Sequence, residues 1–203
     1  MENMCYLRFF QASLNAPALD IYINDVALVK DFAYKDFTKY FKAVSGSYNI
    51  KIFVSGNKNL IVLDENIELY PNNIYTLAII GLFNLNGIEI NLIDDHLRDI
   101  NKNYSYIRFI NLSPSSRDLD IVLNNNLAIS ELSYATVSSY LELPPGRYNF
   151  KAYLSSQQKL VLENPNMTLD PGKIYSGYVL GIENIKDSMQ IVIPLEGATY
   201  LKF

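Results

Sequence analysis

Two serine–lysine pairs have the spacing used by a class of serine acyltransferases. Ser55 and Lys58 form one Ser-x-x-Lys match, and Ser156 and Lys159 form the other. In those enzymes the spacing is effective because a turn of helix brings the hydroxyl and the amine together. Both matches here lie in polar segments typical of hairpin turns, so we expect solvated turn residues rather than a nucleophile and its base.

The single histidine and the single cysteine do not complete a catalytic or metal site. His96 is the only imidazole, and Cys5 lies far from it in the chain. A hydrolase triad needs a base beside its nucleophile, and structural zinc needs four ligands. We expect His96 to be a solvated linker residue. We expect Cys5 to be a partly exposed thiol, with an intermolecular crosslink as the alternative.

Three carboxylates, Asp94, Asp95 and Asp99, suggest a calcium site close to the middle of the chain. Calcium is bound by about six to eight oxygens supplied in a regular pattern, and the sequence has no such pattern there. A solvated, charged linker is the favoured interpretation. The sequence therefore predicts no catalytic, cofactor-binding or metal-ligating residue, no cofactor and no enzyme activity.

Composition excludes several classes of partner. Of the 203 residues, 49% are hydrophobic and 19% charged, which is typical of a globular protein, and the net charge is −4. Lysine and arginine are scattered singly, so a nucleic-acid footprint is not expected. The first residues lack the basic and apolar regions of a signal peptide, and no apolar run is long enough for a membrane helix, so membrane insertion is not expected.

The chain repeats itself after a hundred residues. About two dozen identities fall in this one register, far more than chance gives. They include, with their partners a hundred positions later, Arg8, Phe9, Ser13, Leu19, Asp20, Ile21, Asn24, Tyr34, Tyr40, Gly46, Tyr48, Asn49, Lys51, Pro71, Ile74, Tyr75 and Gly81. Near the end the match improves with one extra residue, which we place in the turn 185–188.

A repeat of this length has the size of an independent domain. We predict a first domain at residues 5–94, a linker at 95–104 and a second domain at 105–203. Ile93, Leu97 and Ile100 have helical spacing, so a short helix in the linker is an alternative.

Each copy has the pattern of a β-sandwich. Leu19, Ile21 and Ile23 alternate with polar residues, and 119–124 repeats the pattern, which buries one face of a strand. Turn residues recur about every 8–12 positions, as in immunoglobulin-like folds. The predicted fold is all-β, with two tandem immunoglobulin-like antiparallel β-sandwich domains of about seven strands each.

Four repeated tyrosines follow these turns: Tyr48, Tyr75, Tyr148 and Tyr175. One interpretation is a ligand-binding platform. We favour the other, in which each ring packs in the core while the hydroxyl holds a loop backbone, as corner tyrosines do.

Three segments resemble a known family. They are Ser13–Asn24, with its Asn-Ala-Pro and Leu-Asp-Ile-Tyr-Ile-Asn elements, Leu143–Tyr148 (Leu-Pro-Pro-Gly-Arg-Tyr) and Leu169–Tyr175 (Leu-Asp-Pro-Gly-Lys-Ile-Tyr). They are similar to motifs of the domain of unknown function 4397, in tandem over nearly the whole chain. The resemblance implies an immunoglobulin- or transthyretin-like sandwich, mostly in bacterial surface proteins, with no established activity and no functional residues to carry over.

The leading functional hypothesis is a non-enzymatic structural or interaction protein of a bacterial cell-surface, envelope or spore layer. Exposed strand edges give it a route to self-association or to a protein partner. The alternative is a carbohydrate- or peptide-binding module, because the chain has 16 Tyr and 10 Phe. Against a sugar platform, the chain has 0 Trp.

Overall fold

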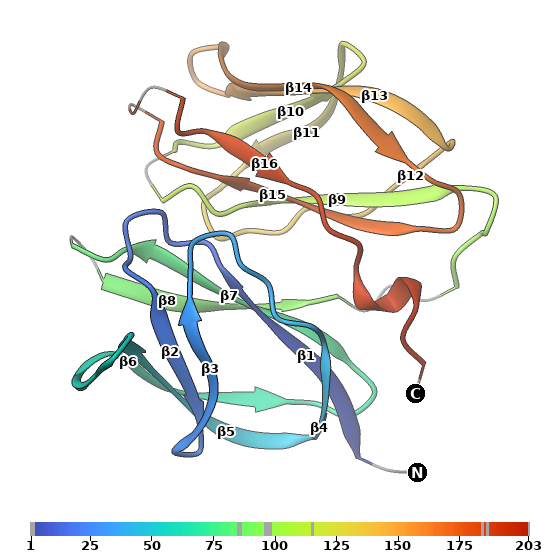
Figure 1. The fold of residues 1–203 in the computed structure, drawn as a ribbon. Helices are drawn as coiled ribbons and strands as arrows, with labels where there is room; N and C mark the ends of the chain where they lie inside the picture. Colours follow the sequence, from blue (N-terminus) through green and yellow to red (C-terminus); the bar gives the residue numbers. More distant parts are fainter. Residues whose placement is uncertain are drawn as a thin grey trace. The chain divides into compact units, whose positions relative to one another are not determined.

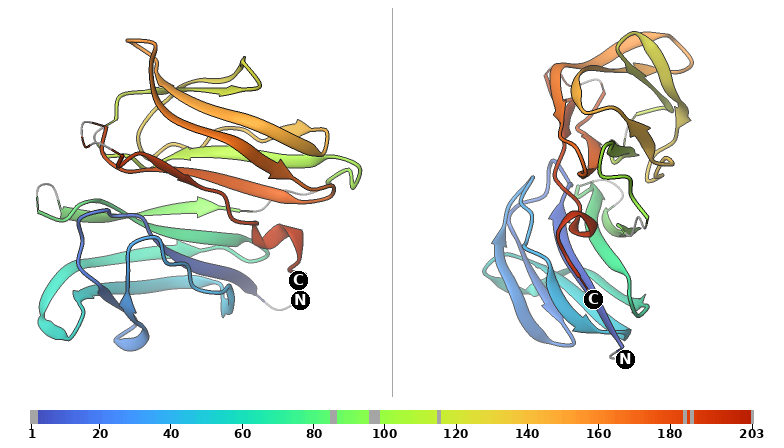
Figure 2. Two further views of the ribbon diagram at one scale, coloured as in Figure 1. Left: turned by 45° about the horizontal axis from the view of Figure 1, so that its top comes forward. Right: turned by 90° about the vertical axis from the view of Figure 1, so that its right-hand side faces the viewer.

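The computed structural model describes residues 3–84, 87–95, 99–114, 116–183, 185 and 187–202. His96 and Leu97, and with them the alternative of a linker helix, lie outside these residues. The chain divides into two compact units, one formed by Met1–His96 with Leu201–Phe203 and the other by Leu97–Tyr200. Each unit is a two-layer β structure (Figures 1 and 2).

The first unit contains eight strands where the sequence predicted about seven. They are β1 (Met4–Gln11), β2 (Leu19–Ile23), β3 (Val26–Phe32), β4 (Phe41–Val44), β5 (Gly46–Val54), β6 (Asn57–Leu69), β7 (Ile74–Leu82) and β8 (Gly87–Asp94).

The second unit repeats these eight strands in the same order and ends in a short 3-10 helix. The strands are β9 (Ser105–Asn111), β10 (Leu119–Leu123), β11 (Asn126–Leu132), β12 (Leu141–Leu143), β13 (Gly146–Leu154), β14 (Lys159–Leu169), β15 (Ile174–Leu180) and β16 (Gln190–Val192), and the helix is η1 (Gly197–Thr199).

Each unit has two four-stranded sheets, which we name by their pairing. The hairpin sheets, with orders β3-β2-β5-β6 and β11-β10-β13-β14, are antiparallel throughout. The parallel-pair sheets have the orders β4-β1-β7-β8 and β12-β9-β15-β16. In them β1 runs parallel to β7, and β9 parallel to β15. The all-β tandem sandwich is confirmed, and the parallel pairs are a detail that alternating hydrophobicity does not reveal, because it reports faces and not directions.

The alternating residues form the core between the two sheets of each unit. In the first unit Leu19, Ile21, Ile50 and Ile52 meet side chains from β1 and β7. Cys5 belongs to the same buried cluster, so the expectation of a partly exposed thiol is wrong. The thiol lies on the core side of β1 because it shares the alternation that buries the other odd-numbered residues of this strand.

The extra residue predicted near the end of the second copy is confirmed by strand register. Ile80 pairs with Glu89 in the first unit, whereas Leu180 pairs with Gln190 in the second. The strands therefore match at an offset of 100 before the turn and 101 after it, which makes Asp95 equivalent to Glu196.

A buried ionic cluster occupies this equivalent position in both units. In the second unit Arg108 Nε donates to Glu196 Oε1 at 2.8 Å and to Ser176 Oγ at 3.1 Å. The Tyr140 hydroxyl donates to Glu196 Oε2 at 2.6 Å, and its ring lies 4.8 Å from the guanidinium carbon. Glu196 is fully buried, and a buried carboxylate is retained only where it is paired and hydrogen-bonded.

The first unit builds the cluster from Arg8, Thr76, Tyr40 and Asp95. Tyr40 donates to Asp95 Oδ2 at 2.6 Å, Thr76 also donates to that oxygen, and Arg8 Nε donates to Thr76 at 2.9 Å. The expectation of a solvated Asp95 is therefore wrong, because the residue is fully buried. The polar residues that surround Asp95 in the sequence do not indicate that Arg8, on β1, lies in the same buried cluster.

The four repeated tyrosines are corner residues, as predicted. The hydroxyls of Tyr48 and Tyr148 donate to the carbonyls of Val44 and Pro144 at 2.5 and 2.6 Å. The hydroxyls of Tyr75 and Tyr175 each accept a backbone N–H from the residue five positions earlier, at 3.1 Å. These bonds tie the turns to the strands that follow them.

Replacing Tyr48 by Phe removes one of these bonds while keeping the ring. We expect the free energy of unfolding to fall by about 1 kcal/mol, because the Val44 carbonyl loses its partner. Urea denaturation followed by circular dichroism measures this, with Tyr70→Phe, at a side chain 61% exposed, as the control. An unchanged stability for Tyr48→Phe would contradict the corner role.

Candidate functional site

The outer face of each hairpin sheet, which points away from that unit's own core, carries the polar and aromatic residues of the repeat. Because Leu19 and Ile21 face the core, their neighbour Asp20 faces outward. Its Oδ1 accepts from the Asp31 backbone at 3.1 Å and from the Ser55 hydroxyl at 3.0 Å. Asp31 has a positive φ of 53° and lies beside a β-bulge. The Asp20 carboxylate therefore joins this bulge to the β5–β6 turn, which contains Ser55.

Asp120 makes the same junction in the second unit. Its Oδ1 accepts from the Glu131 backbone at 3.0 Å and from the Ser155 hydroxyl at 2.6 Å, and its Oδ2 accepts from Gln158 Nε2 at 3.1 Å. Burial alone raises the pKa of this carboxyl, but the three hydrogen bonds together outweigh burial and hold the pKa below its ordinary value. The pKa of Asp20 is lowered in the same way.

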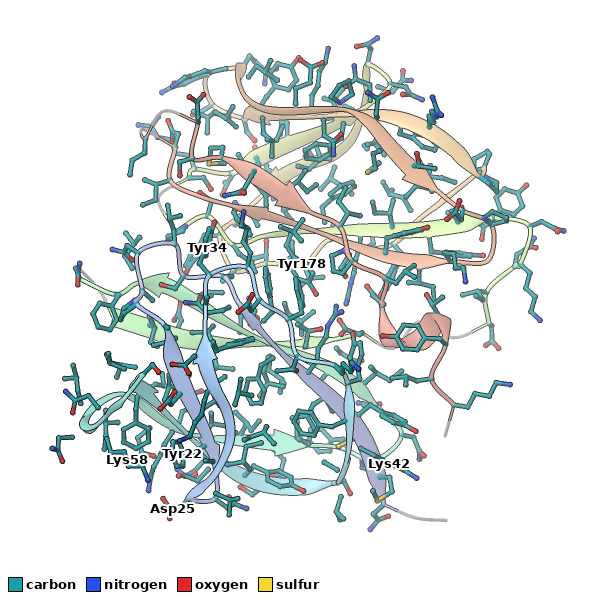
Figure 3. All side chains as sticks on the ribbon, viewed as in Figure 1. Tyr22, Asp25, Tyr34, Lys42, Lys58 and Tyr178 are labelled. Carbon is teal, nitrogen blue, oxygen red and sulfur yellow. The ribbon has the colours of Figure 1, made fainter. Side chains whose placement is uncertain are left out.

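The first unit covers the centre of this face with aromatic rings and a cation. Tyr22 and Phe53 pack edge to face with centroids 5.0 Å apart, and Lys58 Nζ lies 5.3 Å from the Tyr22 centroid. Tyr22 is only 7% exposed as a result. Figure 3 labels Lys58 and Tyr22 and, in the β2–β3 turn, Asp25, which pairs with Lys51 at 2.6 Å.

The second unit leaves a hollow at the same place. It measures about 480 Å³, and its lining comprises Asp120, Val122, Asn125, Leu127, Tyr153 and Gln158. Val122 stands where the first unit has Tyr22. Gln158 lies in the β13–β14 turn and donates to Asp120 Oδ2, as the Gly56 backbone donates to Asp20 Oδ2 in the first unit. A second hollow of about 490 Å³ lies by Arg117, Asp118, Glu131, Ser155 and Ser156.

Exposed apolar side chains mark both edge strands of the first hairpin sheet. On β3, Val26 and Leu28 are 70% and 44% exposed, and on β6, Leu60 and Ile61 are 46% and 51% exposed. The second hairpin sheet exposes Leu127 on β11 and Leu160 on β14. Exposed apolar residues on the unpaired edge of a sheet can be covered by a partner strand.

The residues that the sequence singled out for chemistry have other roles here. Ser55 bonds Asp20 while Lys58 lies over Tyr22, and Ser156 accepts from Arg117 at 3.5 Å while Lys159 lies 4.0 Å from Glu183. The Ser-x-x-Lys pairs lie in and beside hairpin turns, as expected, and no contact joins the two members of either pair. His96 lies outside the described residues.

Asp94, Asp95 and Asp99 have separate environments. Asp94 ends β8 and is exposed, Asp95 is buried in the ionic cluster, and Asp99 is exposed at a bend. Over the described part of the chain, no group of three or more histidine, cysteine and acidic side chains is placed to hold a metal ion. Nor is any helix there long and apolar enough to cross a membrane.

Sequence reasoning missed the hydrogen-bonded junction centred on Asp20 or Asp120, which we call the hub of each unit. It also missed the hollow beside the Asp120 hub. The signal for the hub was present, since both the aspartates and their partners Ser55 and Ser155 are identities of the repeat. The hollow had no such signal. It follows from a difference between the copies, Tyr22 against Val122, whose meaning depends on which side chains touch across the sheet.

Comparisons with known proteins bear on the family and little else. The family model described as "Domain of unknown function (DUF4397)" matches residues 5–121 and 105–196. No curated protein matches the chain. A solved structure from Bacteroides thetaiotaomicron VPI-5482, of proteins (DUF1812) proposed to bind polysaccharides, is 11% identical with a TM-score of 0.25. The match covers 97% of this chain and 96% of that one, and at this TM-score it carries no argument.

The Asp120 hub predicts a specific acid sensitivity. Because its pKa is lower in the folded chain than its ordinary value of 3.8, the carboxyl adds stability above that pH, and this is lost as pH falls through the folded pKa. We expect Asp120→Asn to be less stable than the native chain at neutral pH and to lose less on acidification below about pH 4. Urea midpoints across pH measure this, with the exposed Asp118→Asn as control; parallel curves for the native chain and Asp120→Asn would refute it.

Proposed function

Since the chain belongs to the family of the domain of unknown function DUF4397, which fixes no activity, we propose a function from its own surface. The protein is a non-enzymatic interaction protein of a bacterial cell-surface, envelope or spore layer, and it self-associates through a strand edge of its first unit. The observation that carries the proposal is the set of exposed apolar side chains on the edge strands of the first hairpin sheet.

Strand β6 is the edge that we assign to self-association. It is 13 residues long, it pairs with β5 on one side only, and it contains no proline. An edge strand that exposes apolar residues and unpaired backbone groups is a template for another strand. Leu60 and Ile61, about half exposed, gain burial only if something covers them.

Charge favours a second copy as the partner of β6. Lys58 precedes the apolar run 60–63, and Asp64 follows it. When two copies of this strand run antiparallel, the lysine end of one meets the aspartate end of the other, and this happens twice. Opposite charges across neighbouring strands stabilise their pairing.

The equivalent edge of the second unit is protected. Strand β14 contains Pro165, whereas β6 has no proline; the pairing with the neighbouring strand shifts register in both copies. Proline is a device that keeps edge strands from pairing. The charges that flank the apolar run of β14 form ion pairs, Lys159 with Glu183 at 4.0 Å and Glu163 with Lys151 at 3.7 Å, whereas Lys58 lies over the Tyr22 ring and Asp64 accepts from Asn49 at 2.7 Å.

A matched pair of substitutions tests the proposal. Leu60 on β6 and Leu160 on β14 are exposed to nearly the same extent, 46% and 44%, on the edge strands of the two hairpin sheets. We expect Leu60→Lys to raise the dissociation constant for self-association by about tenfold or more. The substitution removes a leucine side chain that association would bury and puts a charge in its place. Leu160→Lys should leave the constant unchanged.

Sedimentation equilibrium over a range of protein concentrations measures both constants, and circular dichroism checks that each variant is folded. A native chain that stays monomeric at the highest concentration would overturn the proposal. So would equal effects of Leu60→Lys and Leu160→Lys.

A further inference from the structure

The two copies keep one framework but differ in what fills the outer face of the hairpin sheet. In the first unit the ring of Tyr22 is 7% exposed and is covered by Phe53 and Lys58. In the second unit Val122 replaces the tyrosine, and a hollow of about 480 Å³ stands in its place. That volume lies within the range of small-molecule sites.

The same substitutions remove charge from this face. Asp25 of the first unit becomes Asn125, and this amide lines the hollow together with a second one, Gln158 of the β13–β14 turn. The carboxylate that remains, Asp120, already accepts hydrogen bonds from Glu131, Ser155 and Gln158. The lining of the hollow thus offers amide groups beside one bonded carboxylate, with the ammonium of Lys151 at its edge donating to Asn125.

The existing hydrogen bonds of Gln158 and Asn125 determine which amide offers an acceptor to a ligand and which offers a donor. Gln158 Nε2 donates both of its hydrogens, to Asp120 at 3.1 Å and to the Ser155 carbonyl at 3.0 Å, which leaves Oε1 as its acceptor. Asn125 Oδ1 accepts from Lys151 at 3.4 Å, which leaves Nδ2 as its donor. Sugar hydroxyls match such groups at the two ends of the hollow, because each hydroxyl both donates and accepts.

The apolar lining completes this match. Tyr153 contributes an aromatic ring with a polar end, and Val122 and Leu127 contribute aliphatic surface. A pyranose presents C–H groups to such surfaces and hydroxyls at its rim. An extended peptide is served less well, because the hollow lies on a sheet face whose backbone groups are engaged in the ladders of β10 and β13.

We propose that this hollow, on the outer face of the second unit's hairpin sheet, binds an uncharged saccharide. Tyr153, Val122 and Leu127 contact its C–H surface, and Asn125 and Gln158 bond its hydroxyls. The site is independent of β6, so the self-association proposed above and this binding succeed or fail separately.

The test is an amide ¹H–¹⁵N titration of the full chain with defined probes. The uncharged probes are cellohexaose, maltohexaose and mannohexaose, and the comparison probes are a hyaluronan hexasaccharide and an uncharged, unstructured peptide of similar length. We expect at least one uncharged hexasaccharide to shift the amides of residues 120–125 and 153–158. Shifts with the anionic sugar or the peptide alone, or with no probe, would overturn the proposal.

The first unit supplies the substitutions that make the result specific. Val122→Tyr copies the tyrosine that this fold already accommodates in the first unit, and we expect it to weaken binding at least tenfold. Gln158→Ala, at an exposed residue, should weaken binding about tenfold through the lost acceptor. In reverse, Tyr22→Val combined with Lys58→Gln should add shifts at residues 20–25 and 53–58. Unaltered binding by Val122→Tyr, with the rest of its spectrum native, would also overturn the assignment.

Discussion

One carboxylate in each copy, Asp20 or Asp120, holds the hairpin sheet in the form on which its surface depends. It joins a bulge in the β2–β3 or β10–β11 pair to the turn that follows β5 or β13. Both bulges contain a residue with positive φ, Asp31 and Glu131, whose backbone N–H needs an acceptor at that point. Because Ser55 and Ser155 donate to the same carboxylates, the turns beside the apolar edge and the hollow are placed by one shared interaction.

Duplication separates framework from surface in this chain. The corner tyrosines, the hub aspartates and the buried arginine clusters occur in both units, although the clusters exchange Asp95 for Glu196 and Thr76 for Ser176. The outer faces differ. Tyr22 became Val122 or the reverse, and β14 carries a proline where β6 has Glu65. Two copies with one core therefore present two surfaces, one with an open apolar edge and one with a hollow.

Identities a hundred residues apart were enough to predict the tandem repeat and the extra residue after β15. Alternating hydrophobicity and turn chemistry predicted the all-β class and the corner role of Tyr48 and Tyr148. The predictions that failed concern contacts between residues far apart in the sequence. Cys5 was predicted to be partly exposed as a lone cysteine near the terminus, and Asp95 to be solvated as part of a charged linker. The burial of both depends on β1 lying beside β7, a parallel pairing that period-two patterns do not encode. The hub was predictable from the repeated Asp20 and Ser55. The hollow was not, because it is defined by contact across strands.

The central claim is that the first copy's edge pairs and the second copy's edge does not. Hydrogen–deuterium exchange of the full chain at increasing protein concentration tests this claim directly, since a strand that acquires a partner protects its outward N–H groups. We predict that protection rises with concentration at residues 57–63 of β6 and stays constant at residues 159–162 of β14. Protection that is independent of concentration at β6, or that rises equally at both strands, would contradict the account.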